Sequence, residues 1–140
     1  MPVTSDIERM TESTSELIAA VTVPIFAEHV LEPLTGERDF ERALRRLRAW
    51  HGGMLCVTLG ARGAMLLDGD RLYHEPAHPV TVVDTTGAGD VFRGAFIYAL
   101  LRGDAPAEIL RFANGAAAIS CTRLGAINGV PTLAETHAIF

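Results

Sequence analysis

Cysteine is scarce in this chain of 140 residues, which contains only Cys56 and Cys121. The two residues lie far apart and belong to no Cys-x-x-Cys pair, so neither a zinc ribbon nor a redox motif can be read from them. Both stand in apolar runs, which is typical of small buried side chains.

Long apolar runs and an excess of basic charge are also absent. The longest apolar stretch, residues 94–101, is far too short to span a bilayer. The segment from Ser5 to Glu16 is polar and acidic, unlike a leader peptide. A net charge of −5 argues against nucleic acid and anionic lipid as partners. We therefore expect a cytoplasmic protein that binds neither nucleic acid nor membranes.

What the chain does contain is a globular composition, with 49% apolar and 21% charged residues. Its length predicts one domain, which is large enough to bury a core without disulfides or metal.

Strand patterns alternate with helix patterns, which predicts an α/β fold built on a layered sheet. A helix or two short ones are expected over 5–20, and 88–101 should be a helix buried on all sides. Trp50 should pack against the sheet. The helix over 39–50 has a face of four arginines, which we expect to be solvated, the alternative being a basic patch; they are Arg42, Arg45, Arg46 and Arg48. The remaining expected helices are 28–34, 39–50, 106–121 and 132–139, the expected strands are 21–26, 54–59, 64–67, 71–74 and 81–83, and 122–131 is an expected loop.

The stretch most informative about chemistry runs from Val82 to Phe92, where a predicted strand gives way to a helix across two glycines. Glycine lets backbone N–H groups approach a ligand closely. A helix N-terminus adds unpaired N–H donors and the positive end of the helix dipole. Together these features predict a phosphate pocket.

Two common glycine motifs do not fit this stretch. The dinucleotide pattern needs glycine where Phe92 stands, which removes a nicotinamide-dependent oxidoreductase, and no lysine follows the glycines as a P-loop requires. The first turn of the helix carries Asp90 instead. An ionised carboxylate there would accept the proton of a hydroxyl that attacks a phosphoryl group; the plainer alternative is a purely electrostatic helix cap.

Two further segments are candidates for nucleotide contacts. The turn from Thr58 to Gly63 follows a buried strand, and ligands of open α/β sheets bind beyond such strand ends. Asn114 lies among small residues on a predicted helix and could meet a base edge. Taken alone, the turn fits an ordinary strand connection equally well, and the small residues favour tight helix packing.

The sequence Asp-Thr-Thr-Gly-Ala-Gly-Asp from Asp84 to Asp90 closely resembles the C-terminal signature of the ribokinase-like (PfkB) carbohydrate kinases. The Thr58–Gly63 turn, the Leu34–Gly36 triplet and the segment Thr122–Ala126 match that family in the same order. The resemblance implies the C-terminal part of a ribokinase-like three-layer α/β/α sandwich, with residues 1–140 as a single partial domain.

The resemblance also implies ATP-dependent phosphorylation of a sugar or related alcohol. Asp90 then corresponds to the catalytic base, and the N–H groups of Gly87, Ala88 and Gly89 correspond to the anion hole. Mg²⁺ would accompany ATP, and many relatives hold a potassium ion beside the anion hole. The nucleotide-binding positions implied are Thr58, Gly60, Arg62, Gly63 and Asn114, and the cation positions are Asp84, Thr86, Ser120, Arg123, Gly125 and Gly129.

The sequence departs from the family pattern in two respects. Where many relatives have Asn-x-x-Glu, this chain has Ala27 to Val30, so only Glu28 is left to organise phosphates and Mg²⁺. Family members are also considerably longer, and their N-terminal half, which supplies most sugar contacts, has no counterpart here. We therefore expect an exposed apolar surface, with the missing half or a second copy as candidate partner, and a non-catalytic nucleotide-binding fragment is the alternative function. The particular sugar cannot be read.

Overall fold

The computed structural model describes all 140 residues and divides into two compact units, residues 1–59 with 64–74, and residues 60–63 with 75–140. Each unit is described by itself. The prediction that residues 1–140 form one partial domain stays a prediction.

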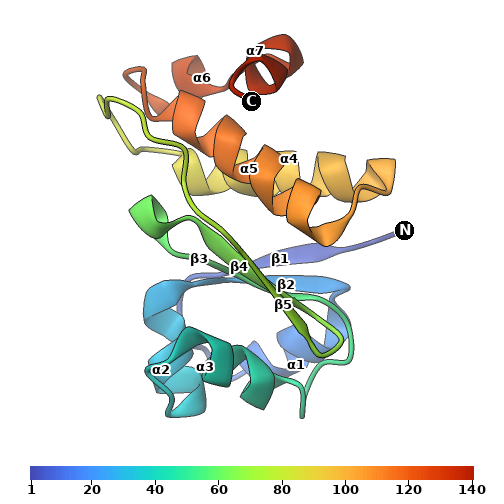
Figure 1. The fold of residues 1–140 in the computed structure, drawn as a ribbon. Helices are drawn as coiled ribbons and strands as arrows, with labels where there is room; N and C mark the ends of the chain where they lie inside the picture. The colour runs from blue at the N-terminus through green and yellow to red at the C-terminus, as the bar shows by residue number, and fades with distance from the viewer. The chain divides into compact units, whose positions relative to one another are not determined.

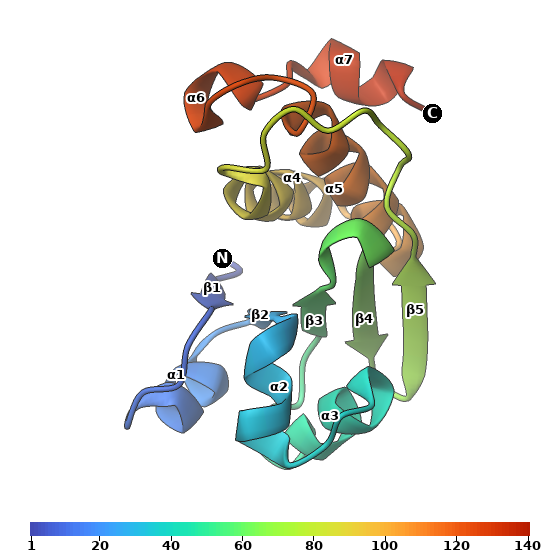
Figure 2. The ribbon, with the colours of Figure 1, turned by 90° about the vertical axis from the view of Figure 1, so that its left-hand side faces the viewer.

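The first unit is built on a five-stranded sheet in the order β1-β2-β3-β4-β5, with α1, α2 and α3 on one of its faces (Figures 1 and 2). The strands β1 to β3 are parallel, and β4 is antiparallel to β3. The elements are β1 Thr4–Ile7, α1 Thr14–Ala20, β2 Val23–Ala27, α2 Glu28–Thr35, α3 Phe40–Leu47, β3 Leu55–Thr58, β4 Ala64–Asp68 and β5 Arg71–Glu75.

An apolar core fills the space between this sheet and its helices. Phe26 and Leu55 from the strands meet Leu31 and Leu44 from the helices, all fully buried. The helix α3 begins where the Asp39 side chain accepts a hydrogen bond from the Arg42 N–H at 2.9 Å, an N-cap that satisfies one orphan donor. The chain order of these elements matches the predicted strands and helices between 21 and 74.

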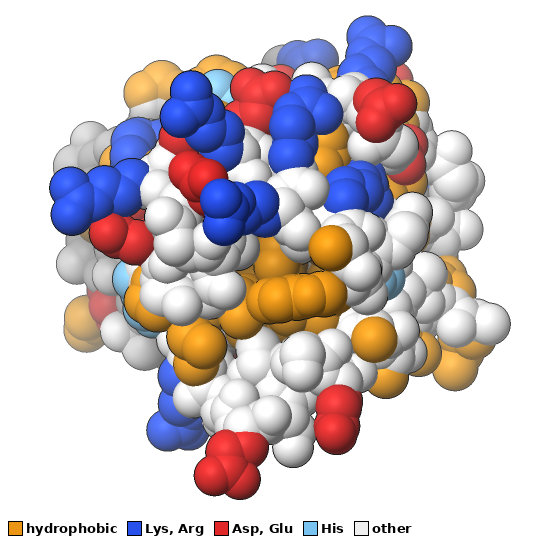
Figure 3. Space-filling view, turned by 90° about the horizontal axis from the view of Figure 1, so that it is seen from below, with side chains coloured by type: hydrophobic (Ala, Val, Ile, Leu, Met, Phe, Trp, Pro, Cys, Tyr) orange, Lys and Arg blue, Asp and Glu red, His pale blue; other side chains and the backbone are white.

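The arginines of α3 form a solvated, paired face and not a basic patch. Arg45 pairs with Glu41 and Arg46 with Glu37, and Figure 3 shows positive and negative side chains next to one another on this face. Arg48 differs, because its guanidinium donates to the carbonyls of Leu67 and Gly69.

The second unit contains the short turn η1 Gly60–Arg62 and four α-helices, α4 Ala88–Arg102, α5 Pro106–Ser120, α6 Ala126–Gly129 and α7 Leu133–Ala138. The helices α4 and α5 pack side by side, and α7 packs on α5. The rings of Tyr98 and Phe112 lie 5.5 Å apart between α4 and α5, and that of His137 lies 5.5 Å from Phe112. No helix combines the length and apolar character that crossing a bilayer requires.

Five structural expectations are wrong. The segment 122–131, expected to be a loop, contains the short helix α6 at Ala126–Gly129. Residues 5–20 are not all helix, because residues 4–7 pair with β2 as a strand and so satisfy their backbone in the sheet. Residues 81–83 form no strand; Val83 donates its N–H to the Cys121 carbonyl instead. The helix α4 is not buried all round, since Leu101 is 62% exposed. Trp50 is 44% exposed and is therefore not buried against the sheet.

Candidate active site

The turn before α4 has the geometry that an anion pocket requires. Gly87 occupies the N-cap position with a positive φ of 79°, a conformation that glycine adopts at little cost. A Cβ on Gly87 would lie 2.7 Å from the Cβ of Ala126, so no larger residue fits. Ala88 donates its N–H to the Thr85 carbonyl at 3.1 Å, whereas the N–H groups of Gly87, Gly89 and Asp90 have no hydrogen-bond acceptor within the chain.

Asp90 projects from the first turn of α4 into solvent. Its side chain is 86% exposed, and the Arg93 guanidinium lies 3.4 Å from Oδ1. The Arg93 side chain is only 12% exposed, so a largely buried cation stands next to an exposed carboxylate. Sequence reasoning missed Arg93, although its spacing of three residues from Asp90 on a helix is that of neighbouring side chains.

Asp84 holds the turn in place from its other end. Its Oδ1 accepts from the Thr86 N–H at 2.9 Å and the Thr86 hydroxyl at 2.7 Å, and its Oδ2 accepts from the Gly125 N–H at 2.8 Å. These bonds, chiefly that from the Thr86 hydroxyl, hold the pKa of Asp84 below its ordinary value, because donated hydrogen bonds favour the ionised form. Asp84 is therefore an ionised tether between the 84–87 turn and the loop at Gly125.

The predicted cation positions are gathered around this tether. The Cys121 carbonyl accepts from the N–H groups of Val83 and Asp84, which places the end of α5 against the turn. A Cβ on Gly129 would lie 2.9 Å from the Ser120 carbonyl oxygen, so the backbone passes close there. Carboxylate and carbonyl oxygens are hard donors that fit a monovalent ion such as potassium. No three His, Cys, Asp or Glu side chains form a cluster of metal ligands.

Two of the predicted nucleotide-binding residues converge on the backbone of residues 75–77. Gly63 has φ of +88°, and a Cβ there would lie 2.7 Å from the Ala77 nitrogen. Asn114 is buried and donates its amide hydrogens to the carbonyls of Glu75 and Pro76, at 2.8 Å and 3.2 Å. Its amide nitrogen is thus engaged within the chain, which leaves its carbonyl oxygen for a ligand.

The other predicted nucleotide-binding residues lie at the ends of short elements. Thr58 ends β3 and donates its hydroxyl to the Phe26 carbonyl at 3.4 Å. Gly60 has φ of +56° and opens η1, and Arg62 is exposed at its end.

An apolar cavity of about 490 Å³ begins at Gly87 and Asp90 and follows α4. Sequence reasoning did not identify it, because its walls come from four helices, α4 to α7, and the loop between α6 and α7. Its other lining residues are mainly apolar, namely Val91, Gly94, Ala95, Tyr98, Phe112, Ala116, Ala126, Ile127, Val130, Pro131, Leu133 and Thr136.

The model of the pfkB family of carbohydrate kinases matches residues 1–133. The chain belongs to the pfkB family of carbohydrate kinases. Among curated proteins, this pfkB member is 40% identical to a ribokinase from Lactococcus lactis over 111 residues, which cover 79% of this chain and 36% of that protein.

Solved structures agree on the fold. An Arabidopsis thaliana ribokinase complexed with ribose and ATP is 32% identical with a TM-score of 0.88, covering 99% of this chain and 47% of that one. A fructokinase double mutant from Vibrio cholerae, bound to fructose, ADP and potassium, is 29% identical with a TM-score of 0.78, covering 89% and 42%. The fold is therefore the ribokinase-like α/β fold in part, and the chain spans less than half the length of these relatives.

Proposed function

We propose that this pfkB-family chain carries the catalytic part of an ATP-dependent kinase that phosphorylates a hydroxyl of a sugar or related small alcohol. The observation that carries the proposal is the turn that opens α4. It combines the free N–H groups of Gly87 and Gly89 with the exposed carboxylate of Asp90 in one helical turn. Donors for an oxyanion and an acceptor for a proton are the two groups that phosphoryl transfer to an alcohol needs.

In this mechanism Asp90 orients the attacking hydroxyl and takes its proton. The hydroxyl oxygen forms a bond to the γ-phosphorus, the bond from that phosphorus to the β–γ bridging oxygen breaks, and ADP leaves. The anion hole, assigned to Gly87, Ala88 and Gly89, stabilises the charge on the equatorial oxygens of the transferred group. The Ala88 N–H must give up its bond to Thr85 to take part. The chain contains no lysine, so these donors act without a P-loop lysine.

ATP is assigned to Thr58, Gly60, Arg62, Gly63 and Asn114. The Asn114 amide is held by two carbonyls, so its free carbonyl oxygen would accept from the amino group of adenine. Glu28, the first residue of α2, is the remaining candidate to organise Mg²⁺ and the phosphates.

A potassium ion would be held by Asp84, Thr86, Ser120, Arg123, Gly125 and Gly129, mostly through backbone carbonyls. When bound, it would supply positive charge beside the anion hole. We place the protein in the cytoplasm, with ATP and a small sugar-like substrate as ligands and neither nucleic acid nor membrane as partner.

A second candidate function is a non-catalytic nucleotide-binding fragment of such a kinase. It is favoured by the length comparison, since the chain covers 36% of the Lactococcus lactis ribokinase. The apolar cavity along α4 supports the same view, because exposed apolar surface of this kind is typical of an interface. The counterpart of the relatives' N-terminal half, or a second copy of the chain, is the proposed cover.

The test is ATP turnover against a panel of sugars, with Asp90→Ala and, as control, Asp70→Ala in the exposed β4–β5 turn. We expect Asp90→Ala to lower the rate of transfer by about 10²–10⁴-fold while ATP affinity changes little, as for removal of a general base. Asp70→Ala should leave both unchanged. Equal loss of transfer and ATP binding in Asp90→Ala would overturn the assigned role.

The same assay on a longer reconstructed chain separates the two functions. If this chain binds ATP without turning it over and the longer chain does turn it over, the result supports the second function, a non-catalytic nucleotide-binding fragment. Efficient sugar phosphorylation by this chain alone contradicts it.

A further inference from the structure

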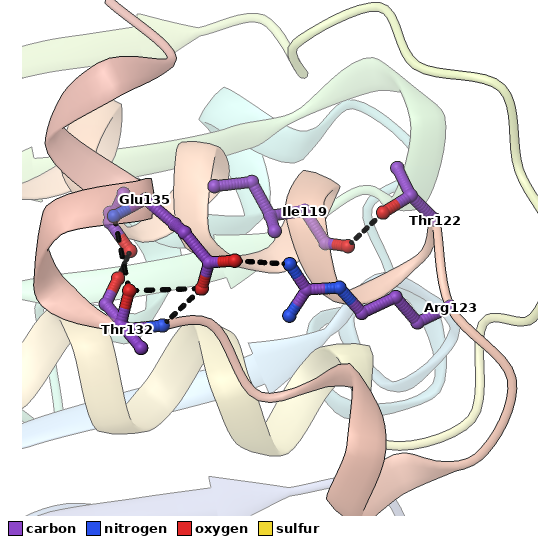
Figure 4. Close-up of polar contacts among 6 residues, drawn as sticks. Ile119, Thr122, Arg123, Thr132 and Glu135 are labelled. Atoms are coloured by element: carbon purple, nitrogen blue, oxygen red, sulfur yellow. Dashed lines mark hydrogen bonds and ion pairs between the residues drawn. The ribbon is translucent and has the colours of Figure 1, made fainter.

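One carboxylate in the C-terminal helix contacts two separate parts of the second unit. Glu135 on α7 pairs through Oε1 with the guanidinium of Arg123, in the loop after α5 (Figure 4). Its Oε2 accepts from the backbone N–H and hydroxyl of Thr132, at 2.7 Å and 2.9 Å. Glu135 thus caps its own helix and also holds the arginine of a loop twelve residues earlier.

The loop that Arg123 belongs to contacts the 84–87 turn at two points. The Gly125 N–H donates to Asp84 at 2.8 Å, and Asp84 in turn accepts both donors of Thr86. Ala126 lies so close to Gly87 that a Cβ on the glycine would be 2.7 Å away. Any shift of residues 123–126 therefore moves the Gly125 N–H, which is bonded to Asp84, and the Ala126 methyl group, which lies against Gly87.

The backbone N–H of Arg123 makes a long hydrogen bond. The Arg123 N–H lies 3.4 Å from the Ser120 carbonyl, well beyond the usual 2.9–3.0 Å of a good backbone bond. Gly125 follows with φ of +85°, where a glycine leaves many alternative conformations open. The contact with Glu135 therefore adds a side-chain restraint at Arg123, next to the restraint that Asp84 places on Gly125.

We propose that Glu135 is a positioning residue for the turn at residues 84–90, acting through Arg123 on the Gly125 N–H and so on Asp84. The inference rests on the proposed function, since that function gives the turn its catalytic role. It adds α7 to the parts of the chain on which anion binding depends.

The competing explanation is that Glu135 serves only to cap α7. The chain offers variants that separate the two roles. Glu135→Gln retains a side chain suited to the capping box but loses the charge that Arg123 pairs with. Thr132→Ala removes the capping hydroxyl and leaves the Glu135 carboxylate free to hold Arg123.

The experiment measures amide hydrogen exchange by NMR at Gly125 and Thr86, the two residues whose N–H groups Asp84 accepts. In Glu135→Gln and Arg123→Gln, exchange at both amides should accelerate about fivefold. This is the effect of losing an ion pair whose contribution lies at the upper end of the range measured for exposed pairs. The double variant should add little to either single one, because both remove the same contact. Thr132→Ala should change these two amides by less than about twofold while accelerating exchange in α7.

Three results would overturn the inference: unchanged exchange at Gly125 and Thr86 in Glu135→Gln, an equal effect from Thr132→Ala, or full additivity in the double variant. Circular dichroism checks that each variant is folded, and Arg123→Lys, which keeps the charge, should fall between wild type and Arg123→Gln.

A titration with ATP, followed at the amides of Gly87, Ala88 and Gly89, distinguishes this inference from the proposed function. No shift in the wild-type chain would remove the proposed function, while the exchange data still decide whether Glu135 holds the turn. With both correct, Glu135→Gln weakens ATP binding and Thr132→Ala does not.

Discussion

The two units of the molecule bury apolar side chains to different extents. Nine of the twelve largest fully buried side chains belong to the sheet-containing unit, among them Phe26 and Leu44. Nine of the fourteen large apolar side chains that are exposed belong to the helical unit, among them Leu101 and Ile127. The first unit is thus organised by a dry core, whereas the second leaves much of its apolar surface open.

The second unit uses hydrogen bonds and glycines where the first uses apolar packing. Five of the seven glycines with positive φ belong to it, including Gly87 and Gly125. The ionised side chains of Asp84 and Glu135 connect its loops through hydrogen bonds. The comparison shows that the candidate site lies in the second unit, where glycines leave backbone N–H groups open to a ligand. This unit contains fewer of the largest fully buried side chains than the first.

The largest expected effect would come from the core of the first unit. Leu44→Ala should lower the free energy of unfolding by about 2–5 kcal/mol, because a fully buried leucine leaves a cavity. Leu101 is an exposed leucine of α4, so Leu101→Ala should change the free energy of unfolding by no more than about 0.5 kcal/mol. Urea unfolding measures both, and equal losses would break the contrast between the two units.

Gly87→Ala tests how tightly the turn is specified. The positive φ and the contact with Ala126 should together cost roughly 1–3 kcal/mol and remove most of the ATP affinity. Gly103→Ala is the matched control, since Gly103 has the same φ of 79° with nothing nearby for a Cβ to meet. It should cost about 1 kcal/mol and leave ATP binding intact. If the two variants behave alike in thermal unfolding and ATP titration, Ala126 does not constrain the turn.

A smaller effect is expected at the start of α7. Thr132→Ala removes the hydroxyl that accepts from the Glu135 N–H at 3.2 Å, and N-cap losses of this type cost about 1 kcal/mol. Thermal unfolding should show the loss. Thr132→Ser, which keeps the hydroxyl, should restore most of the stability; failure to do so would contradict the capping role.

The smallest effect concerns pH. The hydrogen bonds from Thr132, and then that from Arg123, lower the pKa of Glu135 from 4.5 to about 2. Ionised Glu135 therefore stabilises the folded chain above about pH 4.5, and this contribution disappears as the pH falls towards 2. Unfolding measured at several pH values should lose less stability on acidification in Glu135→Gln than in wild type.

Much of the candidate site could be predicted because its signals are local. A glycine pair before a helix, followed by an aspartate, specifies an N-terminal turn through backbone sterics alone. Thr132 and Glu135 are likewise neighbours three residues apart, the spacing of a capping box, and the structure forms that capping box. Asp68-Gly69-Asp70 is a turn signal of the same local kind, and the paired strands β4 and β5 flank it in the structure.

The failed predictions share a different cause. Ser5 and Glu8 have the spacing of a capping box, yet the backbone of residues 4–7 pairs with β2, sixteen or more residues away in the chain. The apolar pattern of α4 resembles a helix buried on all sides, although Leu101 and Tyr98 are exposed. The composition of a segment gives its apolar content. How much of the segment's surface is buried depends on which other segments pack against it.

The sequence by itself determined the family, the order of most elements and the residues of the turn that opens α4, because these depend on near neighbours and on a specific motif. Only the tertiary structure decided that Arg123 meets Glu135, that Gly125 donates to Asp84 forty-one residues away, and that Asn114 holds residues 75–76. The physical reason is that a hydrogen bond between distant segments carries no local pattern. It forms only once the packing of the whole unit has placed a donor within about 3 Å of an acceptor.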